Sequence, residues 1–177
     1  MLRLLKQIVD RGLGTEALPL AEPAWRQTPE RIQDAMLHLL GRALAIRHVD
    51  AGSCNGCELE INALGNPYYN VEGHGIRFVA SPRHADLLLV TGPVPANMRA
   101  ALRLAYDAMP DPKLVVAVGA CACDGGIGCT GQALGVGVAN VLPVDVAVPG
   151  CPPPPIQILR GILTAVSARS PAMPHRA

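Results

Sequence analysis

The sequence predicts an α/β fold, in which a parallel sheet is covered by helices on both faces. Short apolar runs recur along the chain between turn residues, a pattern typical of strands that are buried on both sides. Segments with helical periodicity alternate with these runs, as the crossover connections of a parallel sheet require. The predicted strands are residues 45–49, 76–80, 87–91, 114–118 and 144–148.

Three longer helices accompany these strands. The first begins at Thr28, a favourable N-cap followed by a proline, and carries apolar residues at helical spacing up to residue 44. The second runs from Asn97, a predicted N-cap, to about Met109, where nearby prolines end it. The third covers residues 156–166.

The chain divides into one domain and two short flanking segments. Residues 1–27 are predicted to form an N-terminal amphipathic helix and a linker, 28–169 the α/β domain, and 170–177 a tail. The N-terminal helix is expected either to fray or to dock on a partner or a membrane surface. Docking would cover several leucines that the helix would otherwise expose.

Charge and hydropathy argue against two classes of protein. The formal net charge is +1 and no basic run is present, so we expect no binding to nucleic acid. The longest uncharged stretch, residues 125–144, contains six glycines and a proline, which favours loop and buried strand over a membrane span. With no evident signal peptide, we expect a chain without a transmembrane segment, associated with a membrane peripherally at most.

Four of the six cysteines follow predicted strands. Cys54 and Cys57 come after the first strand, Cys121 after the fourth and Cys151 after the fifth. The carboxyl ends of parallel strands share one edge of the sheet, where ligands bind in open α/β folds. Since clustered cysteines without an export signal more often bind metal than form disulfides, this edge is the predicted site. Glycines near each cysteine, at 52, 56, 119 and 150, allow tight turns there.

Three kinds of site are compatible with this spacing, and the alternative to all of them is a set of buried structural cysteines that bind no metal. Four thiolates are the ligand set of a [4Fe–4S] cluster. Structural zinc can also take four cysteines, although its sites usually contain two close pairs and only one pair is present here. A thioredoxin-type dithiol would leave Cys121 and Cys151 unexplained. The spacing favours the iron–sulfur cluster. Cys123 and Cys129 are expected to be thiols outside the ligand set, although Cys123 is near enough to Cys121 to compete.

Four motifs resemble those of a known family and occur in the same order. They are GSCNGCELEI at 52–61, SPRHADLLLVTGPV at 81–94, VGACACDGGI at 118–127 and PGCPPPP at 149–155. They resemble the complex I 20 kDa subunit family, and more closely the small subunits of membrane-bound, energy-converting [NiFe] hydrogenases of the formate hydrogenlyase (hydrogenase-4) type. The likeness runs from about residue 47 to residue 169.

The resemblance implies a flavodoxin-like domain with one [4Fe–4S] cluster on Cys54, Cys57, Cys121 and Cys151. The cluster would be the one nearest to the active site of a partner large subunit. Such a chain is an electron-transfer subunit of an oxidoreductase and not an autonomous enzyme, so we expect no catalytic residue on it and an active centre on the partner.

Partners and location are implied in the same way. The expected partners are a [NiFe]-type hydrogenase large subunit, ferredoxin-like subunits and membrane-arm subunits, at the cytoplasmic face of the inner (cell) membrane. Members from the respiratory complex typically have two adjacent cysteines in the first motif, whereas this sequence has Cys54-Asn-Gly-Cys57, the hydrogenase-type arrangement. The alternative is a complex I-type subunit, of the kind found in NADH-quinone oxidoreductase, that contributes to quinone reduction.

Two further groups near the motifs are candidates for a role. Glu60 falls where the family usually has an acidic residue and is a candidate proton-handling or interface carboxylate, with Glu58 as its competitor. The alternative is an exposed carboxylate at a helix start, which the helix dipole favours. His84 could act on the cluster, but a surface histidine is the simpler interpretation.

Overall fold

The structure is a computed structural model that describes residues 42–126 and 135–169. The predicted N-terminal helix and linker over 1–27, the helix from Thr28 up to residue 41, Cys129 and the tail over 170–177 lie outside the described residues. Leu44 belongs to the first strand, so the prediction that helical spacing of apolar residues continues to residue 44 is wrong at that residue.

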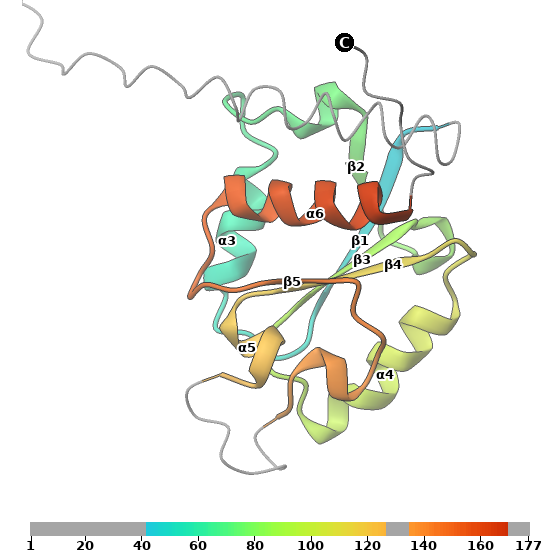
Figure 1. Cartoon of the computed structure of the whole chain (residues 1–177), viewed down its shortest axis with the longest axis vertical. Coiled ribbons are helices and arrows are strands. Elements are labelled where there is room, and N and C mark those ends of the chain that lie inside the picture. The colour runs from blue at the N-terminus through green and yellow to red at the C-terminus, as the bar shows by residue number, and fades with distance from the viewer. Residues whose placement is uncertain (1–41, 127–134, 170–177) are drawn as a thin grey trace, which may run out of the picture.

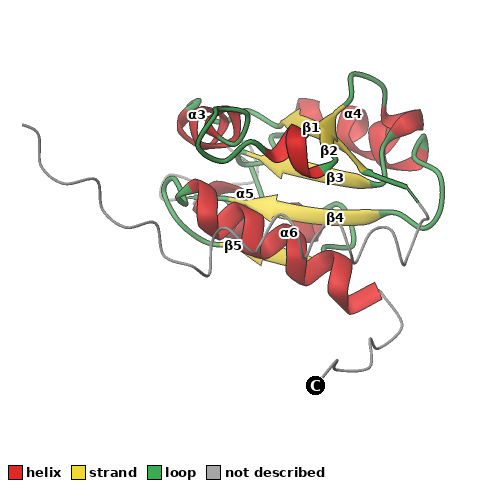
Figure 2. Ribbon diagram, turned by 90° about the horizontal axis from the view of Figure 1, so that it is seen from above, coloured by secondary structure: helices red, strands yellow, loops and turns green. Residues whose placement is uncertain are grey.

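Five parallel strands form one sheet with the order β2-β1-β3-β4-β5. Figures 1 and 2 show the strands side by side and pointing the same way. This order is that of the flavodoxin-like fold, so the predicted fold class is confirmed. The strands are β1 (Leu44–Asp50), β2 (Ile76–Phe78), β3 (Leu87–Thr91), β4 (Leu114–Val118) and β5 (Val146–Val148).

The central strands match the predicted bounds best. β3 and β4 begin and end at the predicted residues, because strands buried on both faces are almost wholly apolar, and Thr91 is the one polar residue of the two. The edge strands β2 and β5 are shorter than predicted: β2 ends two residues before the predicted end, and β5 begins two residues after the predicted start. On β2 the last bond to the neighbour runs from Val79 N to Ile46 O at 2.8 Å.

Helices and short 3-10 turns connect the strands. They are η1 (Val71–His74), η2 (Pro82–His84), η3 (Val138–Asn140), α3 (Gly56–Ala63), α4 (Ala96–Asp107), α5 (Ala120–Asp124) and α6 (Pro155–Arg169). Helix α4 starts one residue before the predicted cap: Pro95 occupies the N-cap and Asn97 lies inside the helix. Helices α3 and α5 were not among the predicted helices, although one interpretation of Glu60 placed it at a helix start. Both helices are short, and each begins at or directly after a glycine, a poor helix former.

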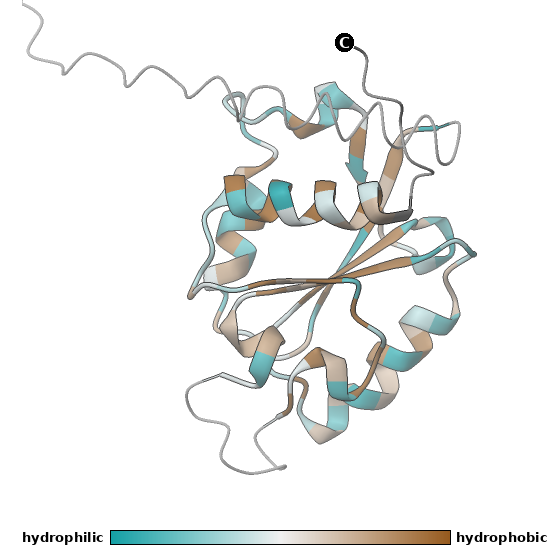
Figure 3. Ribbon diagram, viewed as in Figure 1, coloured by the Kyte–Doolittle hydropathy of each residue, from teal (hydrophilic) through white to brown (hydrophobic). Residues whose placement is uncertain are grey.

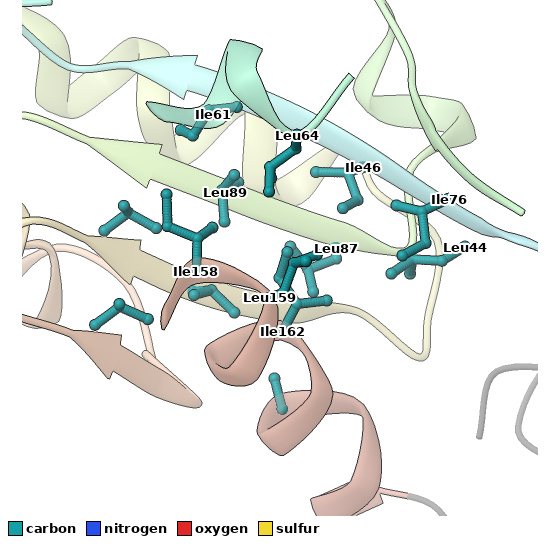
Figure 4. Close-up of a cluster of buried hydrophobic side chains, with 14 of the residues drawn as sticks. Leu44, Ile46, Ile61, Leu64, Ile76, Leu87, Leu89, Ile158, Leu159 and Ile162 are labelled. Carbon is teal, nitrogen blue, oxygen red and sulfur yellow. The ribbon is translucent and has the colours of Figure 1, made fainter. Parts of the chain in front are cut away.

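Each face of the sheet carries its own hydrophobic cluster. Figure 1 shows α3 and α6 on one face and α4 and α5 on the other. Leu87 and Leu89 of β3 point toward α3 and α6, where they pack with Ile61 and Ile158 (Figure 4). Alternate residues point the other way and pack against α4, α5 and η3. Figure 3 shows the strands as the apolar layer between helices with polar outer surfaces.

Asp86 joins three strands at the edge opposite to the cysteines. It is 2% exposed and stands just before β3. Its carboxylate accepts the Ala45 N–H at 3.0 Å and a hydrogen bond from Arg42, while its own N–H donates to Ala45 O at 2.8 Å. Its carbonyl accepts the Leu114 N–H at 3.0 Å. Asp86 therefore holds the starts of β1, β3 and β4 together.

We expect Asp86→Ala to lower the free energy of unfolding by about 1–3 kcal/mol, because the buried Ala45 N–H loses its side-chain acceptor. Urea denaturation followed by circular dichroism measures the change. Asp107→Ala, at an exposed carboxylate on α4, is the matched control and should stay within about 0.5 kcal/mol. An equal loss in both variants would contradict the structural role of Asp86.

Candidate functional site

The last residues of four neighbouring strands are paired in register and form one row across the sheet, next to the predicted site. Asp50 pairs with Thr91, Thr91 with Val118, and Val118 with Val148, and these are the last residues of β1, β3, β4 and β5. The segments that follow β1, β4 and β5 therefore leave the sheet at the same height. The cysteines lie on these three segments, as predicted.

The structure brings the first and second cysteine segments into direct contact. A Cβ atom placed on Gly119 would lie only 2.5 Å from the Sγ atom of Cys57, so the Cys57 sulfur rests on the backbone just before Cys121. On the other side of Cys121, a Cβ on Gly126 would lie 2.7 Å from the Cys121 Sγ. Two of the sulfurs thus lie against glycine backbone, and no larger residue fits at either glycine without a shift.

The third segment reaches the same place. A Cβ on Gly56 would lie 3.6 Å from the Cys54 Sγ and 3.8 Å from Cδ of Pro152, the residue after Cys151. Two backbone hydrogen bonds also continue the β4–β5 ladder beyond the strands. The Gly119 N–H donates to Val148 O at 2.8 Å, and the N–H of the next residue donates to Gly150 O at 2.7 Å.

The backbone at Gly119 requires glycine for a second reason. Its φ of 94° and ψ of 155° lie in a region that is essentially restricted to glycine. This conformation turns the chain sharply from β4 into α5, of which Cys121 is the second residue. The predicted role of this glycine as a turn before the cysteine is in accord with the geometry.

The four predicted ligands differ in exposure. Cys57 is buried, Cys121 is half-buried, and Cys54 and Cys151 are exposed. Burial, followed by smaller effects of the neighbouring Glu58 and of the other three cysteines, raises the pKa of Cys57 to about 11. The other three thiols therefore lie close enough to Cys57 to disfavour its ionisation, an effect that a cationic metal core would reverse.

The donor set fits an iron–sulfur cluster. Four thiolates are the ligands of a [4Fe–4S] cube, and each binds a different iron. Across residues 42–126 and 135–169, no three His, Cys, Asp or Glu side chains are arranged to hold a single metal ion. The sulfurs of Cys57 and Cys121 lie against the backbone of Gly119 and Gly126, where no side chain intervenes.

Cys123 lies two residues after Cys121 on α5 and is half-buried. Residues two apart on a helix face different sides, so the two thiols do not point the same way. Burial raises the pKa of Cys123, and Asp124 adds to the effect. That it lies outside the ligand set remains a prediction.

Glu58, next to Cys57, is a buried carboxylate that the sequence indicated only as the competitor of Glu60. Glu58 is 9% exposed, and its two oxygens accept hydrogen bonds from the hydroxyls of Ser53 and Thr91. The His48 Nε2 lies 3.7 Å from Glu58 Oε1 and 3.0 Å from the Thr91 hydroxyl. These residues come from β1, the cysteine loop, α3 and the end of β3, so the network fixes the loop to the sheet.

The charges of this network follow from its hydrogen bonds. Burial acts to raise the pKa of Glu58, but the hydrogen bonds from Ser53 and Thr91 outweigh it, so the pKa lies below its usual value. Burial lowers the pKa of His48 against the opposite effect of Glu58. At neutral pH the structure therefore favours an ionised Glu58 beside a neutral His48.

Glu60 and His84 occupy different surroundings. Glu60 is half-buried on α3, and no hydrogen bond or ion pair of its side chain is found within the described residues. Its role remains a prediction. His84 is exposed in η2, which precedes β3, so it lies at the edge of the sheet opposite to the cysteines. Its placement agrees with the surface-histidine interpretation.

Comparison with known proteins identifies relatives over most of the chain. The family model of the NADH ubiquinone oxidoreductase 20 kDa subunit matches residues 54–165. The chain is 46% identical over 127 residues to the probable membrane-bound hydrogenase subunit mbhJ of Pyrococcus furiosus, covering 72% of this chain and 76% of the relative. It is 42% identical to formate hydrogenlyase subunit 7 of Escherichia coli, covering 75% of this chain and 52% of that protein.

Two further relatives widen the range of complexes. A subunit of the NADH-quinone oxidoreductase of Desulfovibrio desulfuricans is 44% identical over 124 residues, covering 70% of this chain and 66% of the relative. A chain of the solved membrane-bound sulfane sulfur reductase, an archaeal respiratory membrane complex, has a TM-score of 0.64 at 30% identity, covering 80% of this chain and 76% of that one. The names of these relatives are those of oxidoreductase complexes.

We expect Gly119→Ala to lower the free energy of unfolding by about 1–3 kcal/mol from its backbone conformation alone, with a further loss from the clash with Cys57. Chemical denaturation measures it. Gly65→Ala is the matched control, because its Cβ would meet only Asn62 O at an ordinary 3.5 Å. The control should be neutral or stabilising by up to about 1 kcal/mol. A neutral Gly119→Ala would refute the close approach.

Glu58→Ala should lower the free energy of unfolding by about 1–3 kcal/mol, since the hydroxyls of Ser53 and Thr91 lose a charged acceptor. Glu60→Ala, two residues along α3, should change it by less than about 0.5 kcal/mol. Denaturation of both variants in parallel compares the two carboxylates. A larger effect at Glu60 would show that the network is not the one described.

Proposed function

The chain belongs to the 20 kDa subunit family of NADH ubiquinone oxidoreductase, and we propose that it carries one [4Fe–4S] cluster and relays electrons within a larger complex. The ligands are Cys54, Cys57, Cys121 and Cys151. The complex is membrane-associated and of the [NiFe]-hydrogenase type, and the cluster is the one nearest to the active site of the large subunit.

One observation carries the proposal. Three segments far apart in sequence converge on one edge of the sheet and bring the cysteines there, with the Cys57 sulfur against the backbone of Gly119. Cysteines that only fill a hydrophobic core do not need to lie on three segments that converge at one edge of the sheet. A set of four thiols of which two are exposed is compatible with a cluster that exchanges electrons with another chain.

The residues of this chain hold and shield the cluster. When bound, the cluster supplies one-electron transfer. Cys57 anchors it from the buried side, and Cys54 and Cys151 close it from the surface. The turns at Gly119 and Gly150 fix the direction of the ligand loops, and the Glu58 network ties the first loop to Thr91 at the end of β3. Such outer contacts orient ligands and adjust the potential of a metal centre.

A hydrogenase partner is favoured over a quinone site. The first motif has the hydrogenase-type spacing Cys54-Asn-Gly-Cys57, and the similar proteins include subunits named for hydrogenase and for formate hydrogenlyase. The second candidate is a complex I-type subunit that contributes to quinone reduction, and the similarity to a subunit of NADH-quinone oxidoreductase supports it.

The exposed side of the site implies a partner surface. Cys54 and Cys151 are exposed, and Leu59 on α3, five residues after Cys54, is 61% exposed. The proposed partners are the [NiFe]-type large subunit, ferredoxin-like subunits and membrane-arm subunits. Glu60, half-buried on the same helix, is proposed as a proton-handling or interface carboxylate.

The chain is proposed to lie peripherally on the cytoplasmic face of the cell membrane. Over the residues that the structure describes, no helix is both long and apolar enough to cross a bilayer. Two of the similar proteins carry names that place them in membrane-bound complexes. Attachment to the membrane would then come through the membrane-arm subunits.

The ligand assignment predicts that Cys151→Ala loses the cluster, whereas Cys123→Ala and Cys129→Ala keep it. Iron and sulfide analysis of anaerobically purified protein, with the visible absorbance that dithionite bleaches, measures the content. Equal iron in Cys151→Ala and Cys123→Ala would show that the assignment is wrong. One equivalent of zinc and no bleachable absorbance would instead indicate a zinc-stabilised structural adaptor.

The hydrogenase assignment predicts hydrogen-dependent dye reduction by the purified complex, because electrons from a [NiFe] centre would leave through this cluster. Cys151→Ala should abolish that activity without releasing the large subunit. NADH-dependent or other quinone reduction in the absence of any hydrogen-dependent activity would favour the complex I-type alternative.

A further inference from the structure

A basic groove lies between α4 and η3, on the face of the sheet opposite to α6. It has a volume of about 410 Å³ and is lined by Arg99, Ala100, Arg103, Asn140 and Val141. Figure 1 shows α4 beside the short orange helix η3 that forms the other wall. No acidic residue is among the described residues that line the groove.

The two arginines lie on the same side of α4. They are four residues apart, so their side chains are neighbours one helical turn apart, at a Cβ spacing of about 5–6 Å. The Arg103 guanidinium donates to Val141 O at 3.1 Å, which holds that side chain along the wall of the groove. A guanidinium has five N–H donors, so this bond does not exhaust it. Like charges one turn apart repel each other, and a bound anion would relieve the repulsion.

An apolar ridge runs beside the arginines. The ridge consists of Ala100 and Leu104, each of which follows an arginine by one position. Ala100 is exposed, and Leu104 is 70% exposed, the highest value among the large hydrophobic side chains of the described residues. Arginine next to exposed aliphatic surface is typical of protein interfaces, where it is enriched relative to lysine. Asp107, the acidic residue of α4, lies one helical turn after Arg103 at the end of the helix, and it does not line the groove.

These features select the chemistry of the partner. Arginine binds carboxylates through paired N–H donors, and two guanidiniums one turn apart match two acidic side chains on one segment. The ridge adds an apolar contact that a free inorganic anion cannot use. We propose that this groove is a docking site for an acidic segment of a partner protein, with its carboxylates on Arg99 and Arg103 and an apolar side chain on Leu104.

The groove does not include the cysteines, so the proposal can be tested apart from the cluster. The full-length chain is titrated with a deca-glutamate peptide at low ionic strength by calorimetry. We expect binding that weakens as salt is added, because exposed charges are screened. The double variant Arg99→Glu/Arg103→Glu should bind about tenfold more weakly or not at all.

The control is Arg160→Glu, which reverses an exposed charge on α6, on the other face of the sheet. It should bind as the wild type does, and all variants should keep the wild-type melting temperature. An equal loss in Arg160→Glu would show only a general effect of net charge and would overturn the proposal. So would a wild-type chain that does not bind the peptide.

Leu104→Ser separates the ridge from the arginines. It should leave deca-glutamate binding unchanged and weaken binding of a peptide in which leucine alternates with glutamate. Vesicles of phosphatidylglycerol provide the competing arm. Vesicle binding that depends on Arg99 and Arg103, with no peptide binding, would assign the groove to a membrane surface and refute the proposal.

Discussion

The level, in-register pairing of β1, β3, β4 and β5 is the constraint on which the site depends. Because Asp50, Thr91, Val118 and Val148 lie in one row, the segments that follow three of these strands start at the same height. Any shift of register between two of the strands would move one cysteine segment along the sheet by about 3.3 Å per residue and turn its side chains over. The geometry of the ligands is thus set by the core of the sheet.

The site itself is held from two sides. On one side the Cys57 sulfur lies against Gly119, at a distance that leaves no room for a side chain. On the other side Glu58 accepts hydrogen bonds from Thr91 in the strand row and from Ser53 in the ligand loop. Close packing and a buried charged network act on the same helix α3, and together they fix the direction in which the first pair of thiols points.

Much of this arrangement could be predicted from particular residues. The short runs 87–91 and 114–118 predicted β3 and β4 at both ends, since strands buried on both faces are apolar at all positions here except Thr91. The positions of the cysteines directly after strands were enough to place them at one edge. Helix α3 was not predicted in the same way, because it is only eight residues long and begins at Gly56, a poor helix former, and the favourable N-cap residue Asn55 makes no capping hydrogen bond.

The sequence by itself determined the α/β class, the candidate ligands and the family, because these depend on apolar periodicity and on short motifs that are local along the chain. Only the tertiary structure decided between Glu58 and Glu60 as the buried carboxylate. The rotation of α3 directs Glu58 to Thr91, 33 residues away, and leaves Glu60 half-buried. The tertiary structure also placed Arg99 and Arg103 in one groove beside η3. Both results depend on how elements distant in sequence pack together, which local patterns do not encode.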